Sequence, residues 1–161
     1  MEYRRMGRTG LKVSEVCLGT MTFGHSTDQT EAQKIVDLAF DAGINFFDTA
    51  DAYSWGVSEE VIGRALRDLA RREEVVIGTK FYHPTGDSPN QRGVSRKHIM
   101  AAVDLSLRRL GTDYIDLYAF HKLDPPTPME EMLEAMHDLV KSGKVRYIGA
   151  SNILAWHMAK L

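Results

Sequence analysis

The chain has 161 residues, of which 43% are hydrophobic, and 20 Lys and Arg residues face 22 Asp and Glu residues. This composition is typical of a globular protein and excludes disordered, collagen-like and coiled-coil chains. The net charge of −2 argues against a nucleic-acid or membrane-surface partner, and no apolar run approaches the roughly 20 residues that cross a bilayer. The single cysteine, Cys17, fits a reducing compartment, so we expect a cytoplasmic protein.

A β-hairpin is predicted at the start of the chain, followed by five buried strands. The hairpin strands lie at residues 3–6 and 11–13 and flank the turn sequence Gly-Arg-Thr-Gly at residues 7–10. Short apolar runs of the kind found in parallel strands covered on both faces come next. They lie at residues 16–19, 45–48, 75–80, 114–120 and 145–150.

A helical pattern of apolar residues follows each of the first four buried strands. These patterns lie at residues 32–39, 61–69, 99–110 and 132–140, and glycines 43, 111 and 143 mark three of the ends. For the fourth helix we expect Thr127 as the N-cap, Pro128 as the first helical residue and Glu130 as the partner in a capping box. Asp28 with Glu31 predicts a weaker start for the first helix.

Alternating strands and helices form either an open, doubly wound sheet or a (β/α)8 barrel. Residues 19–24 lack the glycine fingerprint by which doubly wound folds bind dinucleotides, so we expect an α/β chain that forms the N-terminal part of a (β/α)8 TIM barrel. A whole barrel takes about 250 residues, and residues 154–161 read as a fifth helix without a stop signal. We therefore expect one partial barrel, with the hairpin at 1–14 and five strand–helix units at 15–161, that needs the remaining strands from the same or a separate chain.

Polar residues follow the strands at their carboxyl ends, where barrels gather functional groups. An uncompensated buried ammonium is costly, so Asp48 is expected to pair with Lys80. Tyr53 can then act as a proton donor to a carbonyl, because a nearby ammonium stabilises a phenolate, while His121 orients the substrate oxygen. No amino acid supplies a hydride, which implies a cofactor. Each residue alone also has a structural interpretation, as an ion pair, a packed tyrosine or a satisfied histidine.

The ordered motifs resemble the signature of the aldo-keto reductases. The matching segments are residues 7–14, 47–53, 56–59, 78–80, 115–118 leading to His121, and 149–152. The resemblance implies a metal-free reductase that uses NADPH to reduce aldehydes and ketones, on a barrel whose bottom the hairpin caps. By position it implies catalytic roles for Asp48, Tyr53, Lys80 and His121. It also implies cofactor contacts from Gly19, Thr20, Met21, Asp48, Ser151 and Asn152.

Four aromatic residues near the strand ends are expected to line a pocket for small apolar or aromatic carbonyl compounds. These are Phe23, Trp55, Phe81 and Tyr82. Ser54 and Trp55 depart from the family, which often has a small residue after the tyrosine. In the family, most contacts to the pyrophosphate and the 2′-phosphate come from strands after the fifth, so we expect residues 1–161 alone to be inactive.

Three alternatives remain open from the sequence. A metal-dependent hydrolase would have to bring His25, His83 and His121 together, although no H-x-H or H-E-x-x-H motif is present. The family also contains channel-associated β-subunits that bind the cofactor and act mainly as partners. In those subunits the position that matches His121 looks like an asparagine. The histidine in this chain therefore favours an enzyme. The third alternative is a non-enzymatic half-barrel.

Overall fold

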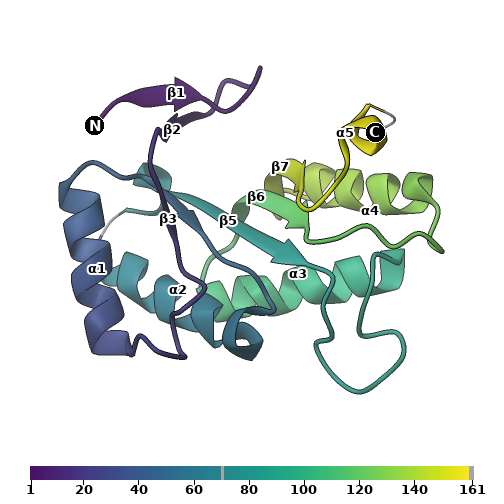
Figure 1. The fold of residues 1–161 in the computed structure, drawn as a ribbon, viewed down its shortest axis with the longest axis horizontal. Coiled ribbons are helices and arrows are strands. Elements are labelled where there is room, and N and C mark those ends of the chain that lie inside the picture. The colour runs from purple at the N-terminus through teal and green to yellow at the C-terminus, as the bar shows by residue number, and fades with distance from the viewer. Residues whose placement is uncertain (70, 160–161) are drawn as a thin grey trace.

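The computed structural model describes residues 1–69 and 71–159, and it is built around a five-stranded parallel sheet (Figure 1). The strands are β3 (Cys17–Gly19), β4 (Phe46–Asp48), β5 (Val76–Phe81), β6 (Ile115–Phe120) and β7 (Val145–Ala150). They lie in the sheet in the same order as in the chain, and all neighbouring pairs are parallel. The order therefore never reverses, as it would at the switch point of a doubly wound sheet.

The helices form a layer on one side of this sheet. They are α1 (Gln29–Asp41), α2 (Val57–Leu69), α3 (Arg96–Leu110) and α4 (Met129–Lys141), and each packs against the next along the chain. Figure 1 shows this layer following the curve of the sheet. Right-handed crossovers that all proceed in one direction place their helices on one face. The α/β fold is thus consistent with part of a TIM barrel.

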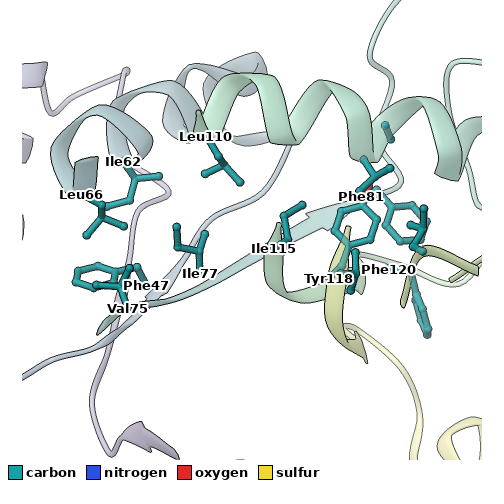
Figure 2. Packing of buried hydrophobic residues seen from close by; sticks show 14 of the residues in the cluster. Phe47, Ile62, Leu66, Val75, Ile77, Phe81, Leu110, Ile115, Tyr118 and Phe120 are labelled. Atoms are coloured by element: carbon teal, nitrogen blue, oxygen red, sulfur yellow. The ribbon is translucent and has the colours of Figure 1, made fainter. Parts of the chain in front are cut away.

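The core lies between the sheet and the helices. Side chains alternate along a strand, so every second residue faces the helices. Figure 2 shows Phe47, Ile77, Phe81, Tyr118 and Phe120 in this layer, close to residues of α2 and α3 such as Ile62, Leu66 and Leu110. The opposite face of the sheet carries the alternate residues, including Asp48 and Lys80.

The helix start predicted at Asp28 is confirmed, and Ser95 caps α3 in the same way. Asp28 accepts a hydrogen bond from the Glu31 amide at 2.9 Å, and Ser95 accepts one from the His98 amide at 3.3 Å. The capping box predicted at Thr127 is wrong, because Pro128 is the N-cap and makes no side-chain bond to the helix. The Thr127 hydroxyl instead donates to the Asp124 carboxylate of the preceding turn.

The hairpin consists of β1 (Tyr3–Arg5) and β2 (Lys12–Ser14), which pair in antiparallel register. It contacts the chain just before β4, because Tyr3 Oη donates to the Gly43 carbonyl oxygen and the Ser14 amide donates to Asn45 Oδ1. The hairpin therefore lies at the amino end of β4, away from the predicted site.

Three short helical segments complete the described chain: η1 (Tyr53–Gly56), η2 (Arg72–Glu74) and α5 (Ala155–Met158). The end of the predicted fifth helix, residues 160–161, lies outside the described residues. Of the helices in the described ranges, none has the length and hydropathy that a membrane crossing needs.

Candidate active site

Asp48 and Lys80 meet on the face of the sheet that is turned away from the helices. Asp48 lies opposite Gly78 in the register of β4 and β5, and Lys80 is two residues further along the same face. Lys80 Nζ donates to Asp48 Oδ2 at 2.6 Å and to the Thr49 carbonyl oxygen at 2.8 Å. The Lys80 side chain is only 12% exposed. An ammonium so poorly hydrated needs these partners, as the sequence predicted.

Tyr53 stands beside this ion pair at the start of η1. Lys80 Nζ lies 5.3 Å from the centre of the Tyr53 ring. The two residues after Tyr53 have left-handed backbones, with φ of 50° at Ser54 and 57° at Trp55. Such conformations are costly for residues other than glycine. A hydrogen bond from Ser54 Oγ to the Phe23 carbonyl oxygen, 3.0 Å long, helps to hold the turn.

His121 completes the cluster from the end of β6. Its ring centre lies 5.8 Å from that of Tyr53 and 5.0 Å from that of His83, with both contacts edge-on. Burial lowers the pKa of His121, and the nearby Lys80, His83 and Lys122 lower it further, whereas Asp48 opposes the shift. The imidazole is therefore neutral at pH 7 and can donate one hydrogen bond. Its Nδ1 atom is buried and has no partner.

The residues expected to contact a cofactor fall into two groups. Ser151 and Asn152 follow β7 beside His121, because Asn152 Nδ2 donates to the His121 carbonyl oxygen at 3.0 Å and to Ser151 Oγ at 3.1 Å. Gly19 pairs with Asp48 across β3 and β4, and a Cβ added there would meet no atom within 4 Å. Met21 is exposed on the turn after β3.

Thr20, also predicted to contact a cofactor, has a fully buried side chain. Its Oγ1 bonds the Asp48 carbonyl oxygen at 3.1 Å and Ser58 Oγ at 2.9 Å. Ser58 in turn lies 2.9 Å from Thr49 Oγ1. This hydroxyl cluster joins the ends of β3 and β4 to α2, so the Thr20 side chain supports the site from beneath.

Two of the four aromatic residues predicted for a substrate pocket lie elsewhere. Phe81 is fully buried and stacks on Tyr118 at 4.8 Å, because it follows Lys80 directly and so faces the helices. Phe23 is 2% exposed and belongs to the core. Trp55, by contrast, is 81% exposed, and Tyr82 packs edge-on against His83.

A buried polar cluster behind η1 was not predicted. Glu59 is fully buried, and it accepts hydrogen bonds from Thr79 Oγ1 at 2.6 Å and from Arg109 Nη1 at 3.2 Å. Burial raises the pKa of Glu59, and the hydrogen bonds from Thr79 and Arg109 oppose the rise. Its position, three residues before Ile62 on the apolar face of α2, is the signal that could have revealed it.

The histidines do not form a metal site in this structure. His25 is exposed on the turn after β3, whereas His83 and His121 contact each other. Within residues 1–69 and 71–159, no group of three or more His, Cys, Asp or Glu side chains is arranged to hold a metal ion.

Comparisons with known proteins show which family the chain resembles in sequence. The model of the "Aldo/keto reductase family" matches residues 15–161. An "Uncharacterized oxidoreductase YrpG" from Bacillus subtilis is 48% identical and covers 99% of this chain and 52% of its own length. The "Versiconal hemiacetal acetate reductase" of Aspergillus parasiticus is 43% identical, and the match covers 100% of this chain and 54% of the reductase. A "Probable voltage-gated potassium channel subunit beta" from Oryza sativa subsp. japonica is 43% identical, and the match covers 94% of this chain and 46% of the subunit. The chain thus spans about half the length of these curated relatives.

Proposed function

The chain belongs to the aldo/keto reductase family, and on that premise we propose that it reduces aldehydes and ketones to alcohols with NADPH as the hydride donor. The observation that carries this proposal is the grouping of Asp48, Tyr53, Lys80 and His121 at the carboxyl ends of three adjacent strands. A positioned acid next to an ammonium is what reduction of a carbonyl requires from the protein.

Each of the four residues has a distinct role in this proposal. The Tyr53 hydroxyl donates a proton to the carbonyl oxygen as the alcohol forms. Lys80 stabilises the negative charge that then develops on the phenolic oxygen, and Asp48 holds the ammonium in place by its 2.6 Å bond. Neutral His121 donates a hydrogen bond to the same carbonyl oxygen and orients it.

The residues around this group suit a nicotinamide, which when bound supplies the hydride. The open space over Gly19, beside Asp48, leaves room for a flat ring against the sheet. Ser151 and Asn152 present a hydroxyl and an amide next to His121, and such groups recognise a carboxamide. We assign Met21 to the edge of the same site, and the choice of NADPH over NADH follows the family resemblance alone.

The substrate in this proposal is a small apolar or aromatic carbonyl compound. Trp55 lies two residues after Tyr53 and is exposed, and Tyr82 packs on His83, which in turn contacts His121. Neither nucleic acid nor a membrane is a partner in this proposal, and the protein acts in the cytoplasm.

We further propose that the site works only when the barrel is closed. The chain spans about half the length of its relatives, and the further strands would supply the contacts to the pyrophosphate and the 2′-phosphate. The hairpin, which contacts Gly43 and Asn45 at the amino end of β4, closes the bottom of that barrel.

Replacing Tyr53 with Phe tests the proposed reaction. In the complete protein, meaning this chain together with the further strands, we expect Tyr53→Phe to lower kcat for 4-nitrobenzaldehyde by at least about 100-fold. NADPH consumption at 340 nm measures this loss. Binding of NADPH, followed by its fluorescence, should stay within about twofold, because the hydroxyl acts on the substrate.

Tyr3→Phe is the matched control, since it removes a tyrosine hydroxyl from the hairpin and costs one hydrogen bond to Gly43. It should leave kcat unchanged. A Tyr53→Phe variant that keeps more than about a tenth of the turnover would show that this hydroxyl is not the proton donor.

The channel-subunit relative supports a second candidate, a cofactor-binding subunit without significant turnover. Sequence identity does not separate the two, because both this relative and the fungal reductase are 43% identical to the chain. The position of His121 beside Tyr53 favours the reductase. Tight NADPH binding by the complete protein without consumption of any aldehyde would favour the subunit.

A further inference from the structure

We propose that the buried Glu59–Arg109 ion pair is a positioning device that sets the placement of Tyr53 relative to Lys80. This inference rests on the proposed function, because it assigns Glu59 and Arg109 a part in that same reaction. Neither residue touches the open face of the sheet. They act from the helix side, through the backbone of the segments that carry the two catalytic side chains.

The first half of the device reaches Lys80 through Thr79. The Glu59 carboxylate is fully buried at the start of α2, and Thr79 Oγ1 donates to it at 2.6 Å. Thr79 faces the helices and Lys80, the next residue, faces the opposite side of the sheet. A fixed Thr79 side chain therefore fixes the point on β5 from which Lys80 extends.

The second half of the device reaches Tyr53 through Gly56. A Cβ added at Gly56 would collide with the Arg109 guanidinium, so this group fills the space directly beneath the turn. Gly56 has φ of +92° and ends the turn that contains the left-handed residues Ser54 and Trp55. A strained turn persists only when its surroundings hold it, and Arg109 is the support on this side.

The two halves are joined by the bond from Arg109 Nη1 to Glu59 Oε2, 3.2 Å long. Water cannot replace Arg109 as the partner of Glu59, because the Glu59 side chain has no exposed surface and a buried carboxylate needs a charged partner. The buried Asp51 carboxyl lies close to both residues, since the Glu59 charge raises its pKa and the Arg109 charge lowers it. Loss of Arg109 would thus free the Gly56 turn and change the hydrogen-bond partners of Glu59 at the same time.

The test is Arg109→Ala in the complete protein, combined with chemical rescue. A cavity of about 470 Å³, lined in part by Asp51, Trp55 and Arg109, gives small molecules access to the position of the guanidinium. We expect kcat to fall by about tenfold or more, since small misplacements of reacting groups have large effects on rate. KM for NADPH should change less than twofold, and low millimolar guanidinium should restore most of the lost kcat.

Arg72→Ala is the matched control. The Arg72–Asp116 pair has a similar burial, with Arg72 23% exposed and Arg109 20% exposed, but Arg72 lies before β5, at the amino end of the strand. The Arg72→Ala variant should lose about as much thermal stability as Arg109→Ala. Its kcat should stay unchanged, and guanidinium should have no effect on it. Equal loss of kcat in both variants, or no rescue by guanidinium at Arg109→Ala, would overturn the inference.

A second readout separates this inference from the proposed function. Within residues 1–161, a Trp156→Phe background leaves Trp55 as the remaining tryptophan, and it belongs to the turn above Arg109. Any tryptophan of the further strands is replaced with Phe in the same background. We expect Arg109→Ala to shift the Trp55 emission and guanidinium to reverse the shift, whether or not any aldehyde is reduced. A wild-type protein without turnover would overturn the proposed function. An unchanged Trp55 emission would overturn the positioning role.

Discussion

Asp51 carries a buried carboxyl group on the helix side of the segment between β4 and Tyr53. The residue is 4% exposed, and neither carboxylate oxygen reaches a partner in hydrogen-bond geometry. Burial raises its pKa to about 8, and the nearby Glu59 adds to the rise. Arg109 and the amides of Ala52 and Tyr82 oppose it without cancelling it. Folding therefore favours the protonated form of this group.

This shift predicts that Asp51→Asn stabilises the protein more at pH 8 than at pH 5. Because the folded pKa is raised, the contribution of the group to stability is complete below about pH 4 and is lost as the pH rises toward about 8. Asparagine does not titrate and avoids this loss. The difference in Tm gain between the two pH values should be at least a few degrees, since about 1 kcal/mol corresponds to roughly 2–4 °C.

Thermal unfolding followed by circular dichroism at both pH values measures the effect. The cost of placing the asparagine amide in the buried site is the same at both pH values, so it cancels when the two changes in Tm are compared. Equal changes in Tm at pH 5 and pH 8 would mean that Asp51 does not hold its proton in the folded protein.

At the residue scale, the sequence predicted the ion pair but not its surroundings. Asp48 and Lys80 could be paired because each ends a strand and a buried ammonium requires a partner. Phe81 was misplaced because an aromatic residue near a strand end was assigned to the mouth without regard to its alternation with Lys80. The hydroxyl cluster of Thr20 with Ser58 was not predicted, because nothing in the neighbouring sequence indicates it.

At the scale of elements, α2 and α3 approach each other closely where Gly63 meets the end of α3. A Cβ added at Gly63 would collide with the backbone carbonyl oxygen of Leu110. This contact brings α2 close to α3, and the same helix pair places Glu59 against Arg109. Unlike a side chain, the carbonyl cannot rotate away, since Leu110 is the last residue of α3 before the left-handed Gly111.

Gly63→Ala is therefore expected to destabilise the protein, although alanine is the better helix former. The gain in helix propensity is at most about 1 kcal/mol, whereas forcing extra atoms into a packed contact costs about 1–3 kcal/mol. We expect a net loss of about 1–2 kcal/mol in urea unfolding. Gly10→Ala, where a Cβ meets no atom within 4 Å, is the control and should change stability little. A more stable Gly63→Ala variant would show that α3 moves aside freely.

The helix starts show which local sequence signals are enough to predict a cap. Asp28 could be identified as a cap because it lies three residues before the Glu31 amide that it binds, and Ser95 caps α3 with the same spacing. Thr127 had the same type of side chain, but its hydroxyl is used by Asp124 in the preceding turn. A competing partner of this kind depends on how the loop folds, which the spacing of cap residues does not report.

For the whole molecule, the order of the strands could be predicted because each unit is short and connects to its neighbour. The absence of a dinucleotide fingerprint after β3 separated the barrel from the doubly wound sheet, and the unreversed strand order agrees. The crossing of α2 over α3 and the cluster around Glu59 could not be predicted in this way. They depend on distances between helices, and the periodicity of a single helix carries no information about those distances.

The open sheet leads to a prediction about residues 1–161 when they are prepared alone. In the described chain, β3 and β7 each pair with one neighbour only, and unpaired strand edges promote association. We expect the isolated chain to self-associate as its concentration rises and to reduce no 4-nitrobenzaldehyde. Sedimentation velocity, intact mass and the NADPH assay on one sample measure both properties.

An edge variant shows whether that association uses β7. Ile148 is 40% exposed on this strand, and a lysine there would place a charge where another strand would have to pair. Ile148→Lys should shift the isolated chain toward monomer without creating activity, because a charge blocks pairing but supplies no further strand. Since closure of the barrel is what we propose the site requires, a monomeric 18.1 kDa chain that reduces the aldehyde at the rate of the complete protein would contradict that requirement. It would also mean that the half-barrel holds NADPH by residues 1–161 alone.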